Sequence, residues 1–250
     1  MGFLDIVLLA LVEGITEFLP VSSTGHLILT SRLLGADQTE FLKSFEIFIQ
    51  LGAILSVVVL YAKTLATDYK TLKKLAVAFI PTGVIGLILY RVIKSFLLSN
   101  SSVVLWSLLL GGIFIILFEF FYREKDTAVG EMSSMTYGQA FLIGVFQSLA
   151  VVPGVSRAAA TIIGGLILGL KRRTIVEFSF LLAVPTMACA TGLDLAKTAF
   201  TFTPEQFQYL LLGFILSFVA ALLAIKFLLS FIRNNSFMFF GIYRILIALI

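Results

Sequence analysis

Long apolar runs separated by short polar stretches dominate the chain and predict helices that cross a membrane. Three such runs occur in each half: Phe45–Tyr61, Leu75–Tyr90 and Val103–Phe121 in the first, and Glu177–Leu195, Phe207–Leu229 and Phe237–Ile250 in the second. A spanning helix takes roughly 20 apolar residues, and we expect each of these segments to cross the bilayer. The runs lack the alternation of a membrane β-barrel, so the pattern favours a helical bundle.

Two shorter apolar arms around a break with proline and serine precede each triplet. The arms are Gly2–Leu19 and Gly25–Leu34 around PVSST, and Gly138–Val152 and Ala158–Leu170 around PGVSR. An arm of about ten residues covers only about 15 Å, too little for a hydrocarbon core of about 30 Å. Irregular backbone at membrane depth needs protein or a water-filled cavity around it. Both pairs are therefore predicted to be re-entrant hairpins.

The same order of elements occurs twice, which predicts an internal duplication. A shift of 134 residues places Glu13 over Gln147 and Ser22 over Ser156. We expect one membrane domain over residues 1–250, with repeat one at about 1–125 and repeat two at about 135–250. An odd number of crossings per repeat would invert the second copy, so that the hairpins enter from opposite faces and meet. The predicted fold class is an all-α polytopic membrane protein with two inverted repeats, each a re-entrant helical hairpin plus three transmembrane helices.

Composition supports this assignment, since 60% of the residues are hydrophobic and only 13% are charged. No water-soluble core needs so much apolar surface. The net charge of +4 is modest and reflects basic loops, so we expect no nucleic-acid partner. The single cysteine, Cys189, cannot form a disulfide within the chain.

The basic residues of the loops predict the orientation of the bundle, because Lys and Arg collect on the cytoplasmic side. One side holds Lys63, Lys70, Lys73, Lys74, Arg123, Lys125, Lys171, Arg172, Arg173 and Arg233; the other holds Arg32, Lys43, Arg91, Lys94 and Lys197. The richer set marks the cytoplasm. Both termini and the open side of the first hairpin would then lie outside.

The first break lies in EGITEFLPVSSTGH, which runs from Glu13 to His26 and contains the only histidine of the chain. Charged groups in a membrane normally face a polar cavity or a partner, so this cluster is a candidate catalytic site. Glu13 and Glu17 are four residues apart and share a helix face, where they can bind one metal ion or share a proton. A pair of interfacial carboxylates is the simpler alternative.

Hydroxyl groups follow directly after these carboxylates. Ser22, Ser23 and Thr24 can cap the next helix, whose free N–H groups form an anion site suited to phosphate. His26 lies near one turn into that helix, where it could relay a proton or hold phosphate oxygens. Simple helix capping and a structural histidine are the alternatives.

The second break supplies a permanent positive charge. Arg157 follows the Pro-Gly break in PGVSR and would begin the next helix. A guanidinium is a forked donor suited to phosphate oxygens, and without an anion its burial would be costly. We therefore expect the duplicated turns to have diverged, one keeping a nucleophile and the other gaining an anion-binding arginine.

Together, EGITEFLPVSSTGH and PGVSRAAAT resemble the paired signature of the undecaprenyl-diphosphate phosphatase family, the bacitracin-resistance proteins of bacterial inner membranes. This resemblance covers the whole chain. It implies hydrolysis of undecaprenyl diphosphate to undecaprenyl phosphate and inorganic phosphate, which recycles the lipid carrier for cell-wall synthesis. It also implies a multi-pass protein of the inner membrane whose active site opens to the outer, periplasmic face.

The resemblance also implies roles for individual residues. The active-site positions fall on Glu13, Glu17, Ser23, His26 and Arg157, with Ser23 as nucleophile and Glu17 or His26 accepting its proton. We expect phosphate contacts from Ser22, Thr24, Gly25, Gly154, Ser156 and Thr161. Val155, Ala158 and Ala159 depart from the usual PGTSRSGAT, so this turn lacks side chains for secondary phosphate contacts.

Several expectations complete this hypothesis. Glu13 and Glu17 would hold a divalent cation, Mg or Ca, since both metals prefer oxygen ligands. The partners would be a polyprenyl diphosphate lipid, the bilayer and a second copy in a homodimer. Direct attack by water, with Ser23 only donating a hydrogen bond, stays open beside a phosphoserine intermediate. The rival functions are a polyprenyl-phosphate transporter or flippase, because inverted repeats with broken helices are typical of transporters, and a scaffold protein.

Overall fold

The computed structural model describes residues 2–36, 39–92, 101–195 and 202–249. Helices account for most of the described chain. Their bounds are α1 Phe3–Thr16, α2 Ser23–Leu33, α3 Glu40–Leu60, α4 Ala62–Thr67, α5 Tyr69–Val92, α6 Ser101–Phe121, η2 Met132–Ser134, α7 Tyr137–Ser148, η3 Leu149–Val151, α8 Arg157–Ile167, α9 Arg172–Leu195, α10 Pro204–Phe231 and α11 Met238–Ala248. Within these ranges the only β pairing is an isolated bridge between Val129 and Leu170. The prediction of an all-α polytopic membrane protein is confirmed.

Four of the described helices, α3, α5, α6 and α10, are long and apolar enough to cross a membrane. Helix α9 has 24 residues, which is a sufficient length, but its composition is more polar. Helix α11 has only 11 residues. At 1.5 Å per residue it covers about 16 Å, so the prediction that the Phe237–Ile250 segment crosses the bilayer is wrong for this helix taken alone.

Helix α5 begins six residues before the predicted apolar run because a polar first turn continues the helix. The Asp68 carboxylate accepts hydrogen bonds from the Thr71 backbone N–H at 3.0 Å and from the Thr71 hydroxyl at 2.6 Å. These bonds hold the pKa of Asp68 below its ordinary value. The cap therefore places the start of α5 in the polar region outside the apolar core of the bundle.

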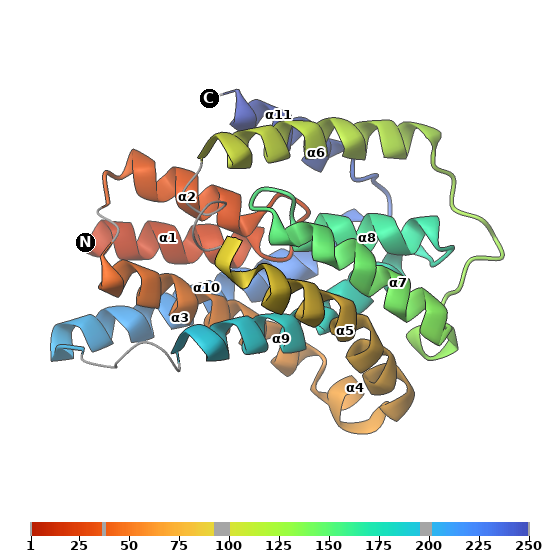
Figure 1. Ribbon diagram of the computed structural model, residues 1–250, viewed down its shortest axis with the longest axis horizontal. Helices are drawn as coiled ribbons and strands as arrows, with labels where there is room; N and C mark the ends of the chain where they lie inside the picture. Colours follow the sequence, from red (N-terminus) through yellow and green to blue (C-terminus); the bar gives the residue numbers. More distant parts are fainter. Residues whose placement is uncertain (1, 37–38, 93–100, 196–201, 250) are drawn as a thin grey trace.

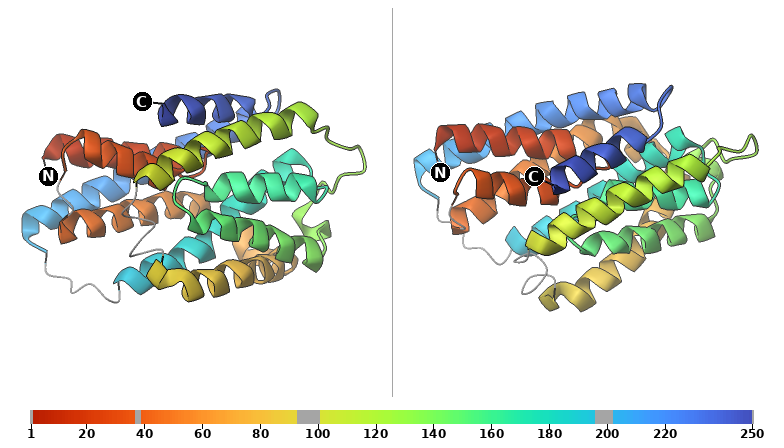
Figure 2. Two further views of the ribbon diagram at one scale, coloured as in Figure 1. Left: turned by 45° about the horizontal axis from the view of Figure 1, so that its top comes forward. Right: turned by 90° about the horizontal axis from the view of Figure 1, so that it is seen from above.

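The two hairpins, α1–α2 and α7–α8, approach from opposite ends of the bundle, and their turns lie near its centre (Figures 1 and 2). Each hairpin packs against a long helix of the other half, α1 against α10 and α7 against α5. Glycines allow both approaches: a Cβ added at Gly14 would lie 2.5 Å from the Ser217 carbonyl oxygen, and one at Gly144 would lie 1.9 Å from the Ala78 oxygen.

This exchange of partners between the halves is what an internal duplication predicts, and the order of elements agrees with it. Each half has two short helices joined at an irregular break, followed by a long helix, α3 in the first half and α9 in the second. The inversion of one half relative to the other in the membrane, and the repeat boundaries, stay predictions.

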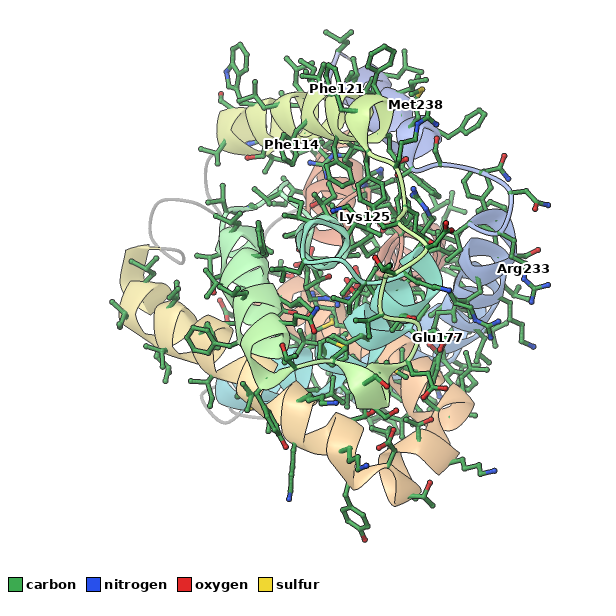
Figure 3. The ribbon with its side chains drawn as sticks, turned by 90° about the vertical axis from the view of Figure 1, so that its right-hand side faces the viewer. Phe114, Phe121, Lys125, Glu177, Arg233 and Met238 are labelled. Atoms are coloured by element: carbon green, nitrogen blue, oxygen red, sulfur yellow. The ribbon has the colours of Figure 1, made fainter. Side chains whose placement is uncertain are left out.

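The two ends of the bundle differ in charge. The termini lie at one end in Figure 1, together with the end of α2 that carries Arg32 and the start of α3 that carries Lys43. Figure 3 shows the opposite end, where Lys125 and Arg233 lie. Lys125 and Arg233 of the richer basic set therefore lie at the end opposite the termini. Lys94 and Lys197 of the smaller set lie outside the described residues.

The outer surface of the helices is apolar. Large hydrophobic side chains are exposed along it, among them Leu87, Ile88, Trp106, Phe120 and Leu223. A water-soluble monomer rarely exposes so much contiguous apolar surface, whereas lipid tails cover it without cost. The exposed residues therefore agree with a protein that is embedded in a bilayer.

Candidate active site

The same rare backbone conformation occurs in both hairpin turns. Ser22 has φ +74° and Ser156 has φ +75°, and they are the only residues other than glycine with positive φ in the described ranges. Each serine caps the following helix: the Ser22 hydroxyl accepts from the Gly25 N–H at 3.4 Å, and the Ser156 hydroxyl accepts from the Ala159 N–H at 3.2 Å. The left-handed residue redirects the chain, so that α2 and α8 begin at the bend.

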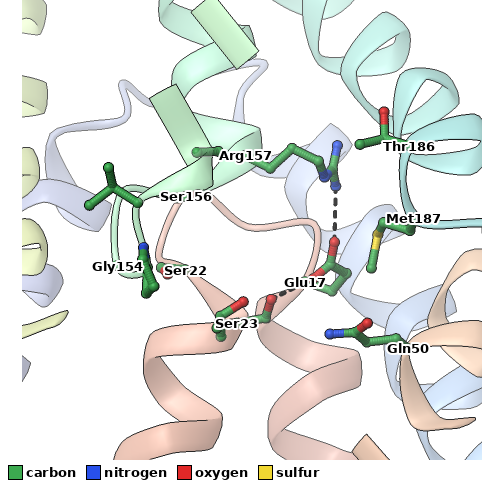
Figure 4. A pocket seen from close by; sticks show the side chains of 13 residues that line it. Glu17, Ser22, Ser23, Gln50, Gly154, Ser156, Arg157, Thr186 and Met187 are labelled. Carbon is green, nitrogen blue, oxygen red and sulfur yellow. Dashed lines mark hydrogen bonds and ion pairs between the residues drawn. The ribbon is translucent and has the colours of Figure 1, made fainter. Parts of the chain in front are cut away.

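A cavity of about 240 Å³ lies between the two turns (Figure 4). Helices α2 and α8 both begin at this cavity, where their first N–H groups have no partners within the helix and the positive ends of their dipoles lie. The lining residues come from both turns and from α3 and α9: Glu17, Ser22, Ser23, Thr24, Gln50, Ala150, Val152, Pro153, Gly154, Ser156, Arg157, Thr186 and Met187. The cavity is thus polar and suited to an anion.

Glu17 connects the two turns directly. The Ser23 hydroxyl donates a hydrogen bond to Glu17 Oε2, and Arg157 Nη2 lies 3.2 Å from Glu17 Oε1. Both charged side chains are buried, with 12% of Arg157 and 6% of Glu17 exposed. One carboxylate therefore holds the serine hydroxyl and the guanidinium on its two oxygens, and the predicted meeting of the hairpins is observed.

The remaining contacts of Arg157 fix its side chain from α9. Arg157 Nη1 donates to the Ser179 carbonyl oxygen at 2.9 Å, and the guanidinium carbon lies 5.9 Å from the centre of the Phe18 ring. The Thr161 hydroxyl bonds the Ser179 hydroxyl at 2.5 Å. Arg157 Nε is buried and has no acceptor within the described residues, so one N–H of the guanidinium is unused. The geometry leaves this donor for a ligand.

Glu13 lies one helical turn before Glu17 and is fully buried. Neither of its carboxylate oxygens has a hydrogen-bond partner within the described residues. Unpartnered carboxylate oxygens beside a second carboxylate fit a divalent cation or a shared proton. No group of three or more His, Cys, Asp or Glu gathers in the described part of the chain. A cation here would therefore take its other ligands from water or substrate.

His26 lies behind the turn and does not line the cavity. Its Nδ1 is 2.7 Å from the Ser22 carbonyl oxygen, and its Nε2 is 2.8 Å from the Tyr243 hydroxyl. Both ring nitrogens are thus occupied. From the sequence, either Glu17 or His26 could accept the Ser23 proton. The hydrogen bond from the Ser23 hydroxyl to Glu17 favours the carboxylate.

The other predicted phosphate contacts divide into two groups. Ser22, Thr24, Gly154 and Ser156 line the cavity. The Gly25 N–H is used by the Ser22 cap, and Thr161 is buried and supports Ser179. These two residues lie outside the cavity wall and can act on it only through their neighbours.

Arg244 of α11, which is not among the residues predicted from the sequence, is fully buried. Its guanidinium donates to backbone carbonyls of both turns and of α6: Pro20 at 3.4 Å, Gly154 at 2.7 Å, Val155 at 3.0 Å, Ser107 at 2.8 Å and Leu108 at 3.4 Å. It therefore ties the turns together. A lone arginine in an apolar run was the signal that could have identified it.

Gln50 and Thr186 also line the cavity. From the sequence, a polar residue such as Gln50 in an apolar helix can either line a cavity or bond a neighbouring helix, and the structure places it at the cavity. Thr186 lines the cavity and also bonds a neighbouring helix, since its hydroxyl accepts a hydrogen bond from the Gln147 side chain at 3.1 Å. Their position at the cavity follows from the packing of α3 against α9.

Comparison with known proteins identifies the family. The profile of the family described as bacitracin resistance protein BacA matches residues 6–250. The chain belongs to this family. Among the relatives of this BacA family member, the undecaprenyl-diphosphatase of Aquifex aeolicus (strain VF5) is 54% identical over 98% of the chain and 95% of the relative. The undecaprenyl-diphosphatases of Sulfurihydrogenibium sp. (strain YO3AOP1) and Persephonella marina are 52% and 50% identical over 100% of the chain and 98% of each relative.

Proposed function

We propose that this BacA family member hydrolyses undecaprenyl diphosphate to undecaprenyl phosphate and inorganic phosphate, the activity after which its relatives are named. The observation that carries the proposal is Glu17 holding Ser23 and Arg157 together at the wall of the cavity between the turns. The Ser23 hydroxyl is a nucleophile, the Glu17 carboxylate is a base and the Arg157 guanidinium carries a positive charge. Phosphoryl transfer requires these three kinds of group.

The cavity offers several donors to a diphosphate. Arg157 has an unused Nε–H, and the starts of α2 and α8 contribute N–H groups and the positive ends of two helix dipoles. A phosphoryl oxygen can also replace Glu17 on Arg157 Nη2. In this arrangement the head group lies between the turns, and the polyprenyl tail lies among the apolar helices.

The reaction begins at Ser23. Its Oγ attacks the terminal phosphorus as Glu17 takes the hydroxyl proton, and the bond between that phosphorus and the bridging oxygen breaks. Undecaprenyl phosphate leaves with the bridging oxygen, while Arg157 and the N–H groups stabilise the charge on the phosphoryl oxygens. Water then hydrolyses the phosphoserine and releases phosphate. In the alternative, Glu17 activates water for direct attack, and a trapped phosphoserine at Ser23 distinguishes the two.

We propose that Glu13 and Glu17 hold a divalent cation, Mg or Ca. The support is the pair of Glu13 oxygens that are buried without a partner in the described residues. Such a cation would supply positive charge against the phosphoryl oxygens. Phosphate release by the wild type is expected to fall on addition of a chelator and return with Mg²⁺. Release that is unchanged by the chelator would argue for a shared proton instead.

The proposed location is the bacterial inner membrane, with the cavity reached from the outer face. The basic end shown in Figure 3 supports it, since this end would face the cytoplasm. Single cysteines at Arg32 and Lys125, in a Cys189→Ala background, test the orientation in intact cells. An impermeant maleimide should label position 32 and spare position 125. Assembly as a homodimer stays a prediction.

Purified protein in detergent tests the activity itself. Wild type should release phosphate from undecaprenyl diphosphate, and Ser23→Ala should lower the rate on the order of 10⁴-fold or more, because the nucleophile is lost. Ser133→Ala, which removes a hydroxyl from an exposed segment, is the matched control and should retain the wild-type rate. A pure transporter would release no phosphate, and that result would overturn the proposal.

A further inference from the structure

His26 is held between one backbone group and one side chain. Its Nδ1 lies 2.7 Å from the Ser22 carbonyl oxygen, and its Nε2 lies 2.8 Å from the Tyr243 hydroxyl of α11. The two rings are parallel, with 4° between their planes and 5.5 Å between their centres. Tyr243 is 39% exposed and covers the outer side of the histidine, which is 7% exposed.

These partners determine which nitrogen of the neutral ring carries the proton. A carbonyl oxygen only accepts hydrogen bonds, so Nδ1 must donate to Ser22. Nε2 of the neutral ring then accepts, and the Tyr243 hydroxyl donates to it. Without that hydroxyl, the Ser22 carbonyl alone selects this tautomer, so a larger fraction of the neutral rings carries the proton on Nε2 and no longer donates to Ser22.

The Ser22 carbonyl matters because it belongs to the peptide group that leads into Ser23. The peptide unit is planar, so a hydrogen bond that fixes the carbonyl also fixes the Ser23 nitrogen. Ser22 has a positive φ, a conformation that is unfavourable for a residue with a Cβ and must be held by its surroundings. The imidazole N–H and the His26 backbone N–H, at 3.1 Å, are the two donors to this oxygen.

We propose that Tyr243 is a positioning residue for the hydrolysis. Its hydroxyl holds His26 with the proton on Nδ1, the imidazole holds the Ser22 carbonyl, and this keeps the Ser23 hydroxyl on Glu17. The inference rests on the proposed function for its catalytic consequence, but the hydrogen-bond chain from Tyr243 to Ser22 is independent of the substrate. The neighbouring Arg244 binds carbonyls of both turns, so α11 supports the cavity through two adjacent residues.

The kinetic test compares Tyr243→Phe with Tyr209→Phe. The first variant removes the hydroxyl and keeps the ring against His26. The second removes the Tyr209 hydroxyl, which donates to Glu205 at 3.0 Å on an exposed face, and it should behave as wild type. We expect Tyr243→Phe to lower kcat about tenfold, because one hydrogen bond no longer holds the turn, and to leave KM within about twofold.

The chain contains only one histidine, so ¹⁵N-histidine labelling reports on His26 alone when the protein is purified through a tag without histidine. Wild type should show a protonated Nδ1 and an unprotonated Nε2. Tyr243→Phe should shift protonation toward Nε2. A packing defect would lower thermal stability or kcat without changing the ring protonation.

Each outcome decides the inference. A lower kcat together with the changed tautomer supports it. An unchanged tautomer overturns the role of the hydroxyl, whatever the rate, and a changed tautomer with wild-type kcat overturns the link to Ser23. If wild type releases no phosphate, the proposed function fails, while the ring protonation still tests the hydrogen-bond chain.

Discussion

In the first hairpin turn the residue after the left-handed serine is Ser23, whereas in the second turn it is Arg157. The backbone is otherwise closely alike, with φ of +74° and +75° and the same serine cap on the next helix. A nucleophile thus occupies one turn and a cation occupies the same position in the other. The two turns thus share a backbone shape, and single side chains give each its own chemistry.

The two turns also differ in what surrounds them. Two carboxylates precede the first turn, Glu13 on α1 and Glu17 directly after it, while the second turn has Gln147 at the position equivalent to Glu13. The Gln147 amide donates to Thr82 and Thr186. An acidic cluster on both sides would repel a diphosphate from both, so the loss of charge in the second turn favours anion binding.

After Ser23→Ala, the largest effect expected from breaking this division of roles is at Arg157. Arg157→Ala removes the forked donor and should lower kcat on the order of 10²–10³-fold, as loss of a transition-state donor does. Arg157→Lys keeps the charge without the fork and should fall between alanine and wild type. Phosphate release is the measurement, and Arg173→Ala, at an exposed ion pair with Glu177, is the control. Wild-type turnover by Arg157→Ala would remove this residue from the mechanism.

A smaller effect, on stability, is expected at Gly154 of the second turn. It has φ +92°, and an added Cβ would lie 2.7 Å from the Val104 carbonyl oxygen. Gly154→Ala should lower the free energy of unfolding by about 2 kcal/mol or more, from conformational strain and overpacking together.

Gly169 provides the comparison for this variant, because it has φ +81° but no atom within 4 Å of an added Cβ. Gly169→Ala should therefore cost only about 1 kcal/mol. Unfolding in detergent measures both variants. Equal losses would show that the close approach of Gly154 to α6 contributes nothing.

The smallest effects on stability are expected at the serine helix caps that the two turns share. Ser22→Ala and Ser156→Ala each remove one helix cap, and each should cost about 1 kcal/mol of stability. Because the caps have the same geometry, the two losses should agree within about 0.5 kcal/mol. A much larger loss in one turn would show that the common backbone conformation is held by different interactions in the two halves.

Much of the site could be predicted from the sequence because its signals are local. Proline, glycine and serine mark both breaks, the short arms identify hairpins, and Glu17, Ser23 and Arg157 lie within a few residues of a break. The repeated order of elements was enough to predict that the turns meet. Charged groups in apolar sequence then identified the chemistry.

The contribution of α11 could not be predicted in the same way. On this helix Phe239 is 62% exposed, whereas Arg244 is fully buried. Whether a residue on this helix faces lipid or the turns depends on how α11 packs against α6. The orientation of His26 depends on the same packing through Tyr243, so sequence could not separate His26 from Glu17 as the base.

The most direct measurement of the central claim is a crystal structure with a prenyl methylenediphosphonate. In this analogue carbon replaces the bridging oxygen, so the bond between the bridge and the terminal phosphorus is not cleaved. We expect the terminal phosphorus at about 3–3.5 Å from Ser23 Oγ, and a phosphonate oxygen within hydrogen-bond distance of Arg157. A head group bound against one turn only, or outside the cavity between the turns, would contradict a single site built from both hairpins.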